Sequence, residues 1–396
     1  MTVSRRDFLT STTGLSVAAA CNATSLAAQP ARRKYRACVI GDSDRGDYGH
    51  NLHKVWTGRD NIEVVGLADP DPEGRAQYAQ EAGAAQTYAD YRKMLNELRP
   101  DLVSIGPRWT DRHQEYLMAC VDVGAHGYLE KPISTDLVEA DAMVAAVESN
   151  GLKWSIAHQK RMCPVVHLCK ELIHEKGIIG EVVELRGRGK EDRRAGGEDL
   201  VVLGTHIFDL MLFFMGRPQW CMSSITVDGR AATSDDVAQP SEPVGPILGN
   251  EMQAMFYFKN SVPGFFSSRK NAEGYPGKWG LDIYGAKGII TIRMGRYPET
   301  AWARTRTWAP AKGGVKWEPL PGAVELQGDD PSDVMNAFAI DDLLEAIERD
   351  REPGVSLRSG RDCYEMIQAV YAAHINGGRI DLPLVERRHP LLVWAQ

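Results

Sequence analysis

The chain has 396 residues, of which 43% are hydrophobic and 25% are charged, and its formal net charge is −7 with a pI near 5.9. This acidic balance argues against a nucleic-acid-binding protein, because phosphate recognition requires a basic surface. The length exceeds what one ordinary hydrophobic core supports and predicts two domains. The sequence contains no apolar run of the ~18 residues that a membrane span needs, so we expect none.

Residues 1–30 are typical of an export signal. The run Ser4-Arg5-Arg6-Asp7-Phe8-Leu9 is a twin-arginine motif, and small residues follow it up to Ala28. We expect a twin-arginine signal peptide that is cleaved near Ala28, and a periplasmic mature protein. Cys21, which follows three alanines, leaves a lipoprotein as the alternative. The seven cysteines form no CxxC pair, which favours buried thiols over disulfides or a metal site.

Residues 34–157 alternate between short apolar strands and helices. The predicted strands are 35–40, 62–68, 102–106, 126–130 and 153–157, and the predicted helices are 50–56, 72–82, 88–98, 111–123 and 135–149. This alternation predicts βαβ units, which build a parallel sheet with helices on both faces. The fold class is therefore α/β, and it begins with a doubly wound parallel sheet of the Rossmann type.

The pattern changes in residues 158–396, which we expect to form a second α/β domain with a large, mostly antiparallel open sheet. A helix over 164–176 precedes strand-like runs at 181–189, 219–228, 250–258, 262–269, 279–284 and 288–294, with a Pro- and Gly-rich loop over 236–249. Helices over 333–349 and 359–374 have apolar residues three and four positions apart. We expect these two helices to pack back on the first domain.

The turn after the first strand is an irregular dinucleotide fingerprint. Its candidate cofactor contacts are Gly41, Ser43, Gly46 and Gly49. Only Gly46-x-x-Gly49 keeps a standard spacing, and glycines there allow backbone amides to approach a pyrophosphate. Asp69 ends the second strand, where a carboxylate accepts from ribose hydroxyls and repels the 2′-phosphate of NADP. These residues predict NAD as the cofactor, with NADP less favoured; a turn-forming aspartate is the alternative for Asp69.

Two further strand ends supply candidates. Glu130-Lys131-Pro132 follows strand 126–130, and the proline stops the strand so that the lysine projects into the crevice where open α/β sheets bind ligands. Pro107 and Trp109 follow strand 102–106, and Trp109 either stacks on a cofactor ring or covers the sheet edge. We predict that Pro107, Trp109, Glu130 and Lys131 contact the cofactor and that Lys131 carries a proton beside it.

The segment 187–210 joins a charged, glycine-rich loop to an apolar helix. Its candidate substrate contacts are Lys190, Arg193, Glu198 and Asp199, and a solvated surface loop is the alternative. His206 lies on the apolar helix. It is either a satisfied core residue or a group that holds a substrate hydroxyl.

The sequence resembles the glucose-fructose oxidoreductase, inositol dehydrogenase and MocA (Gfo/Idh/MocA) family. The matching motifs are Glu130-Lys131-Pro132, Gln159-x-Arg161-x-x-Pro164, Gly177-x-x-Gly180 and Gly204-x-His206-x-x-Asp209, which together cover nearly the whole chain after residue 35. The resemblance implies a Rossmann domain followed by an α/β domain, whose open sheet supports contacts in a dimer or tetramer. It also implies a carbohydrate as the substrate.

The resemblance also implies catalytic roles. In dehydrogenases of that family, the lysine of the EKP motif and a D-x-x-x-H pair surround the substrate carbon. Lys131 and His206 match the lysine and the histidine, whereas the aspartate position falls on Val202, which cannot take a proton. Arg161 and Asp209, from the matching motifs, complete the candidate substrate contacts.

Three functions stay open. The first is an exported oxidoreductase with tightly bound NAD that transfers a hydride at a hydroxyl carbon of a sugar in a redox-neutral cycle; export favours this cycle because free nicotinamide is scarce outside the cytoplasm. The second is an NAD-dependent glycoside hydrolase that uses transient oxidation, elimination and hydration. The third is a non-catalytic nucleotide-binding homologue, which Val202 suggests. We rank the oxidoreductase first.

Overall fold

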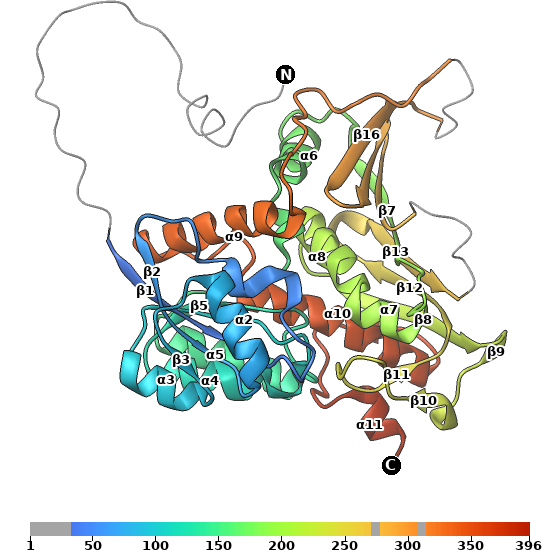
Figure 1. The fold of residues 1–396 in the computed structure, drawn as a ribbon. Helices are drawn as coiled ribbons and strands as arrows, with labels where there is room; N and C mark the ends of the chain where they lie inside the picture. Colours follow the sequence, from blue (N-terminus) through green and yellow to red (C-terminus); the bar gives the residue numbers. More distant parts are fainter. Residues whose placement is uncertain (1–32, 271–277, 308–313) are drawn as a thin grey trace, which may run out of the picture.

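The computed structural model describes residues 33–270, 278–307 and 314–396, which form two α/β units that lie side by side (Figure 1). The predicted signal peptide, residues 1–30, lies outside the described residues. No helix in the described part of the chain combines the length and the apolar character that a membrane span needs. The six cysteines of the described ranges are free and buried, as expected.

The first unit is built on a six-stranded parallel sheet with the order β3-β2-β1-β4-β5-β6. Its strands are β1 Tyr35–Ile40, β2 Ile62–Ala68, β3 Thr87–Tyr88, β4 Leu102–Ile105, β5 His126–Leu129 and β6 Trp154–Ile156. Its helices are η1 Gly49–Lys54, α2 Pro72–Ala82, α3 Tyr91–Leu98, η2 Thr110–Arg112, α4 His113–Asp122 and α5 Leu137–Ser149. This order confirms the predicted Rossmann sheet. The strand order reverses between β1 and β4, and ligands of such sheets bind at the carboxyl ends of these strands.

The segment after β1 differs from the prediction of a helix over 50–56. It forms the short 3-10 helix η1, within which His50 and Asn51 have φ angles of 46° and 58°. Two consecutive left-handed residues interrupt the hydrogen bonding of a regular α-helix. Long-range contacts hold this path, because the amide of Gly49 donates to the carbonyl of Gly106 at 2.8 Å.

The second unit is built on a nine-stranded, mostly antiparallel sheet with the order β16-β15-β14-β7-β13-β12-β8-β17, in which β9 pairs with β8. Its strands are β7 Val182–Arg188, β8 Trp220–Val227, β9 Arg230–Ala231, β12 Glu251–Tyr257, β13 Pro263–Arg269, β14 Gly280–Gly285, β15 Gly288–Met294, β16 Pro298–Arg304 and β17 Ile380–Asp381. The predicted large antiparallel sheet is therefore confirmed. The expected loop over 236–249 contains a small pair of strands, β10 Val237–Ala238 and β11 Ile247–Leu248.

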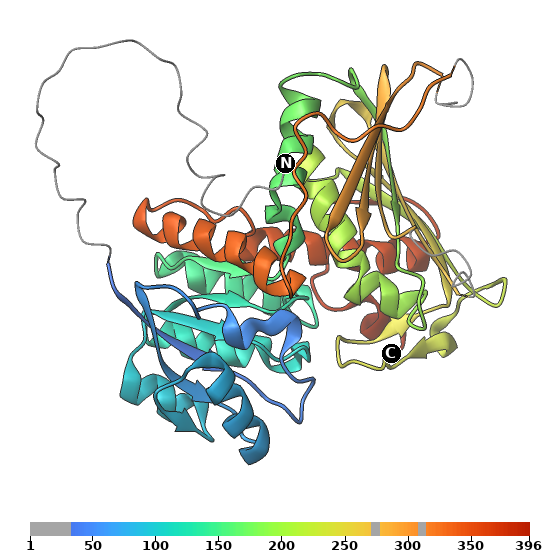
Figure 2. The same ribbon diagram turned by 45° about the horizontal axis from the view of Figure 1, so that its top comes forward.

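Helices cover one face of the large sheet (Figure 2). The helices of this unit are η3 Gln159–Met162, α6 Pro164–His174, α7 Gly197–Val202, α8 Gly204–Met215, η4 Ser234–Asp236, η5 Lys259–Ser261, α9 Pro331–Glu348, α10 Leu357–Asn376 and α11 Pro390–Trp394. On α8, the buried ring of Phe208 packs against Phe256 and Phe266, with centroids 5.3 and 4.8 Å apart. The α8 helix is therefore fixed on the sheet by aromatic packing.

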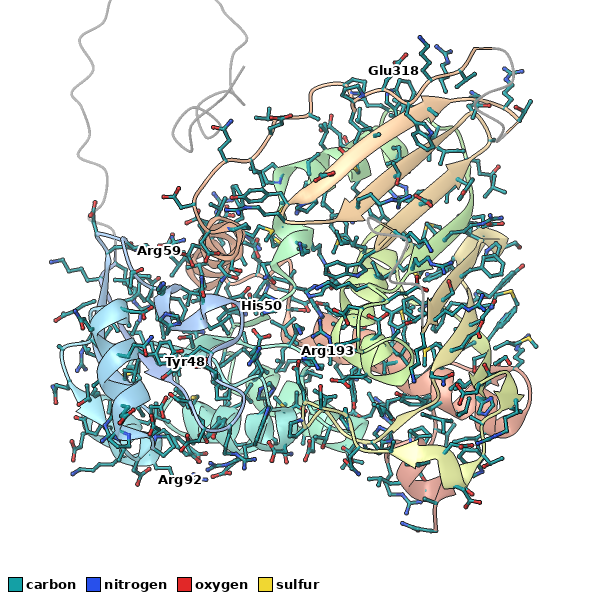
Figure 3. The ribbon with its side chains drawn as sticks, turned by 45° about the vertical axis from the view of Figure 1, so that its right-hand side comes forward. Tyr48, His50, Arg59, Arg92, Arg193 and Glu318 are labelled. Carbon is teal, nitrogen blue, oxygen red and sulfur yellow. The ribbon has the colours of Figure 1, made fainter. Side chains whose placement is uncertain are left out.

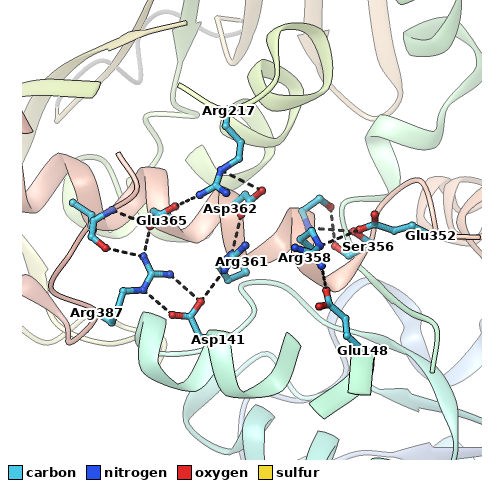
Figure 4. Close-up of polar contacts among 12 residues, drawn as sticks. Asp141, Glu148, Arg217, Glu352, Ser356, Arg358, Arg361, Asp362, Glu365 and Arg387 are labelled. Carbon is cyan, nitrogen blue, oxygen red and sulfur yellow. Dashed lines mark hydrogen bonds and ion pairs between the residues drawn. The ribbon is translucent and has the colours of Figure 1, made fainter. Parts of the chain in front are cut away.

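The last long helices contact both units. The α9 helix packs on η1, β5 and β6 of the first unit, and α10 packs on both α5 and β8. An ion-pair network holds α10 in place (Figure 4): Arg361 and Arg387 both pair with Asp141 of α5, at 2.9 and 2.7 Å, and Arg387 also pairs with Glu365. The shared carboxylates fix the orientation of α10 relative to the first unit.

Candidate active site

Neighbouring side chains approach the backbone of the glycine loop after β1 closely. A Cβ atom on Gly41 would lie 1.8 Å from the hydroxyl of Tyr48, and one on Gly49 would lie 2.4 Å from the carboxyl carbon of Glu130. Only glycine fits at either position. Gly41-x-Ser43-x-x-Gly46 also has the standard dinucleotide spacing, with serine in place of the second glycine, and this spacing is a further signal in the sequence beside Gly46-x-x-Gly49.

Trp109 covers this loop. A Cβ atom on Gly46, whose φ is 89°, would lie 2.4 Å from the ring of Trp109, and the guanidinium of Arg45 lies 5.0 Å from the centre of that ring. Pro107 forms a bridge with Tyr48, and His113 lies with Nε2 2.8 Å from the carbonyl of Pro107. The loops after β1 and β4 therefore pack on each other, with the buried His113 beside them.

Asp69 lies at the end of β2, fully buried beneath the glycine loop. Its carboxylate accepts from the Ser43 amide at 3.1 Å, the Ser43 hydroxyl at 2.6 Å, the Tyr48 hydroxyl at 3.0 Å and the Asp71 amide at 3.0 Å. The Ser43 amide and the two hydroxyls reach Oδ2, and the Asp71 amide reaches Oδ1, so the buried carboxylate is covered by donors of the chain. The ribose contact predicted for Asp69 therefore requires that one of these donors, such as Tyr48, gives way. Sequence reasoning missed Tyr48.

Lys131 is buried at the end of β5, and only 6% of it is exposed. Its Nζ donates to the backbone carbonyl of Val202 at 3.1 Å and lies 3.9 Å from a carboxylate oxygen of Glu130. Burial lowers the pKa of Lys131, while the nearby charge of Glu130 opposes that shift. The Lys131 ammonium therefore loses its proton more readily than an exposed lysine does.

Glu130 is fully buried between Lys131 and His50. The His50 Nδ1 atom lies 2.8 and 3.0 Å from the two carboxylate oxygens. Burial alone would raise the pKa of Glu130, but His50 and Lys131 outweigh burial and lower it. Asn336 of α9 donates to the backbone carbonyl of His50 at 2.7 Å. Glu130 is thus an ionised anchor for Lys131, and the left-handed His50 is held in place from α9.

His206 lies on α8 and faces the same region. Its ring centre lies 5.9 Å from that of His50, 5.6 Å from that of His158 and 5.9 Å from that of Trp279. Burial lowers the pKa of His206 well below its usual value, and the positive charge of Lys131 lowers it further. The imidazole is therefore neutral near pH 7, with one nitrogen able to accept and one able to donate.

Two cations lie close to the ring of Trp279. Lys160 Nζ lies 5.5 Å and Lys190 Nζ lies 5.9 Å from the centre of the indole ring. Lys190 is one of the predicted substrate contacts. Lys160 and Trp279 were missed, because they come from distant segments, η3 and the start of β14, and match no motif that points to a site.

Arg161 and Asp209 bind each other rather than facing open space. The Arg161 Nε donates to Asp209 at 3.0 Å, its Nη2 donates to the other carboxylate oxygen, and its Nη1 donates to the carbonyl of Gly354. Both residues are buried, and His158 Nδ1 lies 3.2 Å from Asp209. Each polar group of this pair thus has a partner within the chain, and a substrate contact at Arg161 or Asp209 stays a prediction.

The carboxylates of the 190–199 loop also have partners. Asp199 is buried and accepts from the Ser268 hydroxyl at 2.6 Å and from the amides of Lys190 and Glu191. Glu198 accepts from the amide and hydroxyl of Ser241. These contacts shape the loop, and the assignment of Glu198 and Asp199 to the substrate stays a prediction. Arg193, in contrast, is exposed in this loop (Figure 3).

The arrangement fits a dinucleotide. Three features lie along the carboxyl edge of the parallel sheet: the glycine loop after β1 with its backbone amides, Asp69 at the end of β2 and the buried Lys131 at the end of β5. Within the described residues, no group of three or more His, Cys, Asp or Glu side chains is placed to hold a metal ion. A hollow of about 870 Å³ on the open face of the large sheet is lined by residues such as Arg186 and Gln253 and contains none of the predicted catalytic groups.

Comparisons with known proteins agree with this geometry. Residues 10–158 match the family model described as "Oxidoreductase family, NAD-binding Rossmann fold". The chain is 24% identical over 375 residues to D-apiose dehydrogenase of Paraburkholderia graminis, covering 90% of this chain and 92% of that protein. It is 21% identical over 264 residues to myo-inositol 2-dehydrogenase of Thermotoga maritima, covering 64% and 74%.

Solved structures show the same fold. A levoglucosan dehydrogenase in complex with NADH and levoglucosan superposes with a TM-score of 0.72 at 20% identity, over 89% of this chain and 100% of that one. The matched model and the relatives together support an NAD-binding oxidoreductase that resembles the Gfo/Idh/MocA family.

Proposed function

We propose that the protein is an NAD-dependent oxidoreductase that acts at a hydroxyl-bearing carbon of a sugar or sugar derivative. The observation that carries this proposal is the buried Lys131, held between Glu130 and the Val202 carbonyl, in the same region as the neutral His206. The names of the relatives, which include an apiose and an inositol dehydrogenase, support a polyhydroxylated substrate.

The chain supplies the proton chemistry. When bound, NAD supplies the hydride acceptor. Lys131, with its lowered pKa, takes the hydroxyl proton at Nζ, because general base catalysis is most effective when the pKa lies near the working pH. Glu130 and His50 fix the position of Nζ. His206 holds the hydroxyl through its neutral imidazole and excludes water from the base.

Replacing Lys131 tests this role. In Lys131→Met we expect hydride transfer to fall by ~10²–10⁴-fold, as is typical for loss of a general base, while NAD still binds. The measurement is the formation of NADH absorbance with a panel of sugars and glycosides. Lys93→Met, an exposed lysine on α3, is the matched control. Unchanged turnover in Lys131→Met would remove Lys131 from the mechanism.

The same panel separates the competing functions. Release of an aglycone from a glycoside, with no net NADH, would identify an NAD-dependent glycoside hydrolase instead. No spectral change with any carbohydrate would favour a non-catalytic homologue.

We further propose that the protein is exported by the twin-arginine pathway and retains NAD, rather than NADP, through a redox-neutral cycle. The Ser4–Leu9 motif supports export, and the carboxylate of Asp69 supports NAD because it would repel a 2′-phosphate. Mass spectrometry of the nucleotide released by denaturing periplasmic protein tests these points together. Protein that is purified from the periplasm without nucleotide would contradict tight retention.

A homo-oligomer is also proposed, built through the open face of the large sheet. The side chains of Met222 and Phe265 are 40% and 36% exposed there, beside the hollow lined by Arg186. Light scattering of wild-type protein and Phe265→Asp tests this assembly. A wild-type monomer would refute it.

A further inference from the structure

The region beside His206 contains positive charge that the proposed hydride transfer does not use. Trp279 lies at its centre, and the rings of His206 and Trp279 are 5.9 Å apart. Lys160 and Lys190 both place their ammonium groups within 6 Å of the indole. We call His206, Trp279, Lys160 and Lys190 the Trp279 cluster.

Lys160 is a buried cation without a counter-ion among the described residues. It is 7% exposed, and within the described residues its ammonium donates to the backbone carbonyl of Gly295 at 2.8 Å. The other buried cations of the site differ, because Arg161 pairs with Asp209 and Lys131 lies beside Glu130. Burying an unpaired charge is costly, and burial with the repulsion from Lys190 lowers the pKa of Lys160 to about 8. Lys160 is therefore still mostly protonated at neutral pH.

Lys190 adds a second cation that reaches the same ring from another segment. Its side chain is 45% exposed, and its ammonium lies 3.4 Å from Asp192. Asp192 also pairs with Arg194 at 2.7 Å, so this carboxylate is shared between two cations. The positive charge of Lys190 is thus only partly compensated, and two cations from different segments lie near the ring of Trp279.

The chemistry of the cluster selects its ligand. Carbohydrate rings pack their apolar C–H faces on aromatic side chains, and the indole Nε1 of Trp279 is buried with no acceptor in the described chain. The ammonium groups offer donors and positive charge. In the proposed function, the adjoining His206 and Lys131 bind the substrate hydroxyl. Resting on the proposed function, we infer that the substrate is an acidic sugar, whose carboxylate is bound by Lys160 and Lys190 while its ring lies on Trp279 and presents a hydroxyl to His206.

A carboxylate fits this cluster better than a phosphate. Phosphates are typically held by guanidinium forks or by successive backbone amides. The nearby guanidinium of Arg161 is occupied by Asp209, and the cluster itself consists of two separate ammonium groups. A single carboxylate between two point charges satisfies both.

The test measures selectivity in the NAD-loaded protein. Titration calorimetry compares D-glucuronate with D-glucose, and D-glucose 6-phosphate serves as a third probe. We expect wild type to bind D-glucuronate at least tenfold more tightly than D-glucose and more tightly than the phosphate. We expect Lys160→Met and Lys190→Gln each to bring the glucuronate-to-glucose ratio toward one.

A stability measurement distinguishes misfolding from loss of selectivity. Lys160→Met keeps an apolar stem and removes an unpaired buried charge, so we expect its unfolding temperature to equal or exceed that of wild type. If Lys160 had only a structural role, the variant would instead unfold at lower temperature and retain the glucuronate preference. Lys190→Gln provides a second variant, and because the Lys190 side chain is exposed we expect this substitution to leave the unfolding temperature unchanged.

The outcomes separate the two proposals. Equal binding of the acid and the neutral sugar by wild type, or selectivity for the phosphate, overturns the acidic-sugar inference. NADH formation from the neutral sugar would in that case leave the proposed function intact. Selective binding of D-glucuronate without any NADH formation would support the ligand class and refute the oxidoreductase.

Discussion

Tyr48 competes with the cofactor for Asp69, and removing its hydroxyl is predicted to tighten NAD binding. In the structure the Tyr48 hydroxyl donates to Asp69 Oδ2 at 3.0 Å, and the tyrosine ring lies against Gly41 and Gly106 at the ends of β1 and β4. A ribose that binds Asp69 must break this hydrogen bond. Tyr48→Phe removes the bond from the free protein while keeping the ring.

The magnitude follows from the bond that is lost. A hydrogen bond to a charged acceptor contributes ~1.5–3 kcal/mol, and ~1.4 kcal/mol corresponds to a factor of ten. The displaced hydroxyl of wild type regains water, so we expect the lower end of this range. NAD should therefore bind about tenfold more tightly to Tyr48→Phe, and the free variant should unfold at a lower temperature because Asp69 loses a donor.

Titration calorimetry with NAD on nucleotide-free protein measures this effect. Tyr78→Phe is the matched control, because its ring lies 4.1 Å from that of Tyr48 and it also loses only a hydroxyl. Ser43→Ala removes the other side-chain donor to Asp69 and should shift the affinity in the same direction. Weaker NAD binding in Tyr48→Phe would refute the reasoning, since it would mean that the hydroxyl contacts the cofactor.

Three further predictions concern the rest of the site. Arg161→Met leaves Asp209 buried without its partner, so the free energy of unfolding measured in urea should fall by ~3–5 kcal/mol, and an unchanged midpoint would contradict a structural ion pair. Gly49→Ala forces Glu130 to move, because the new Cβ atom would lie 2.4 Å from the carboxyl carbon of Glu130. We expect calorimetry to show a free energy of unfolding that is ~1–3 kcal/mol lower, and we expect slower NADH formation. Wild-type values for both quantities would exclude this contact. A carboxylate bound at Lys160 raises the pKa of that lysine above about 8, so binding of D-glucuronate at pH 8 should take up protons and weaken as the pH rises further; equal calorimetric heats in buffers of different ionisation enthalpy would argue against this.

Local sequence patterns predicted the sheets but not the path of the cofactor loop. Strand 62–68 is apolar from Val64 to Ala68, and helix 72–82 has an aspartate cap and a proline at its start, so both segments carry their own signals. The segment 50–56 has helical periodicity as well. Its left-handed residues are imposed by contacts with the loop after β4 and with Asn336 of α9, which lie far away in the sequence.

The same distinction holds for the site. Lys131 was identified because a proline-terminated strand end has a defined place in a Rossmann sheet. Glu198 and Asp199 were selected as charged residues in a glycine-rich loop, yet their partners, Ser241 and Ser268, could not be known without the fold. The sequence does not point to Lys160, because its lack of a counter-ion depends on which side chains the fold places around it.

The contact between Lys131 and residue 202 has a consequence for how the site tolerates substitution. Lys131 donates to the backbone carbonyl of Val202, an acceptor that every amino acid provides. The anchor of the lysine is therefore independent of the side chain at position 202, and loss of an aspartate there need not release the base. Because only the main chain of residue 202 contacts Lys131, the side chain at this position can change with the substrate while Lys131 stays in place.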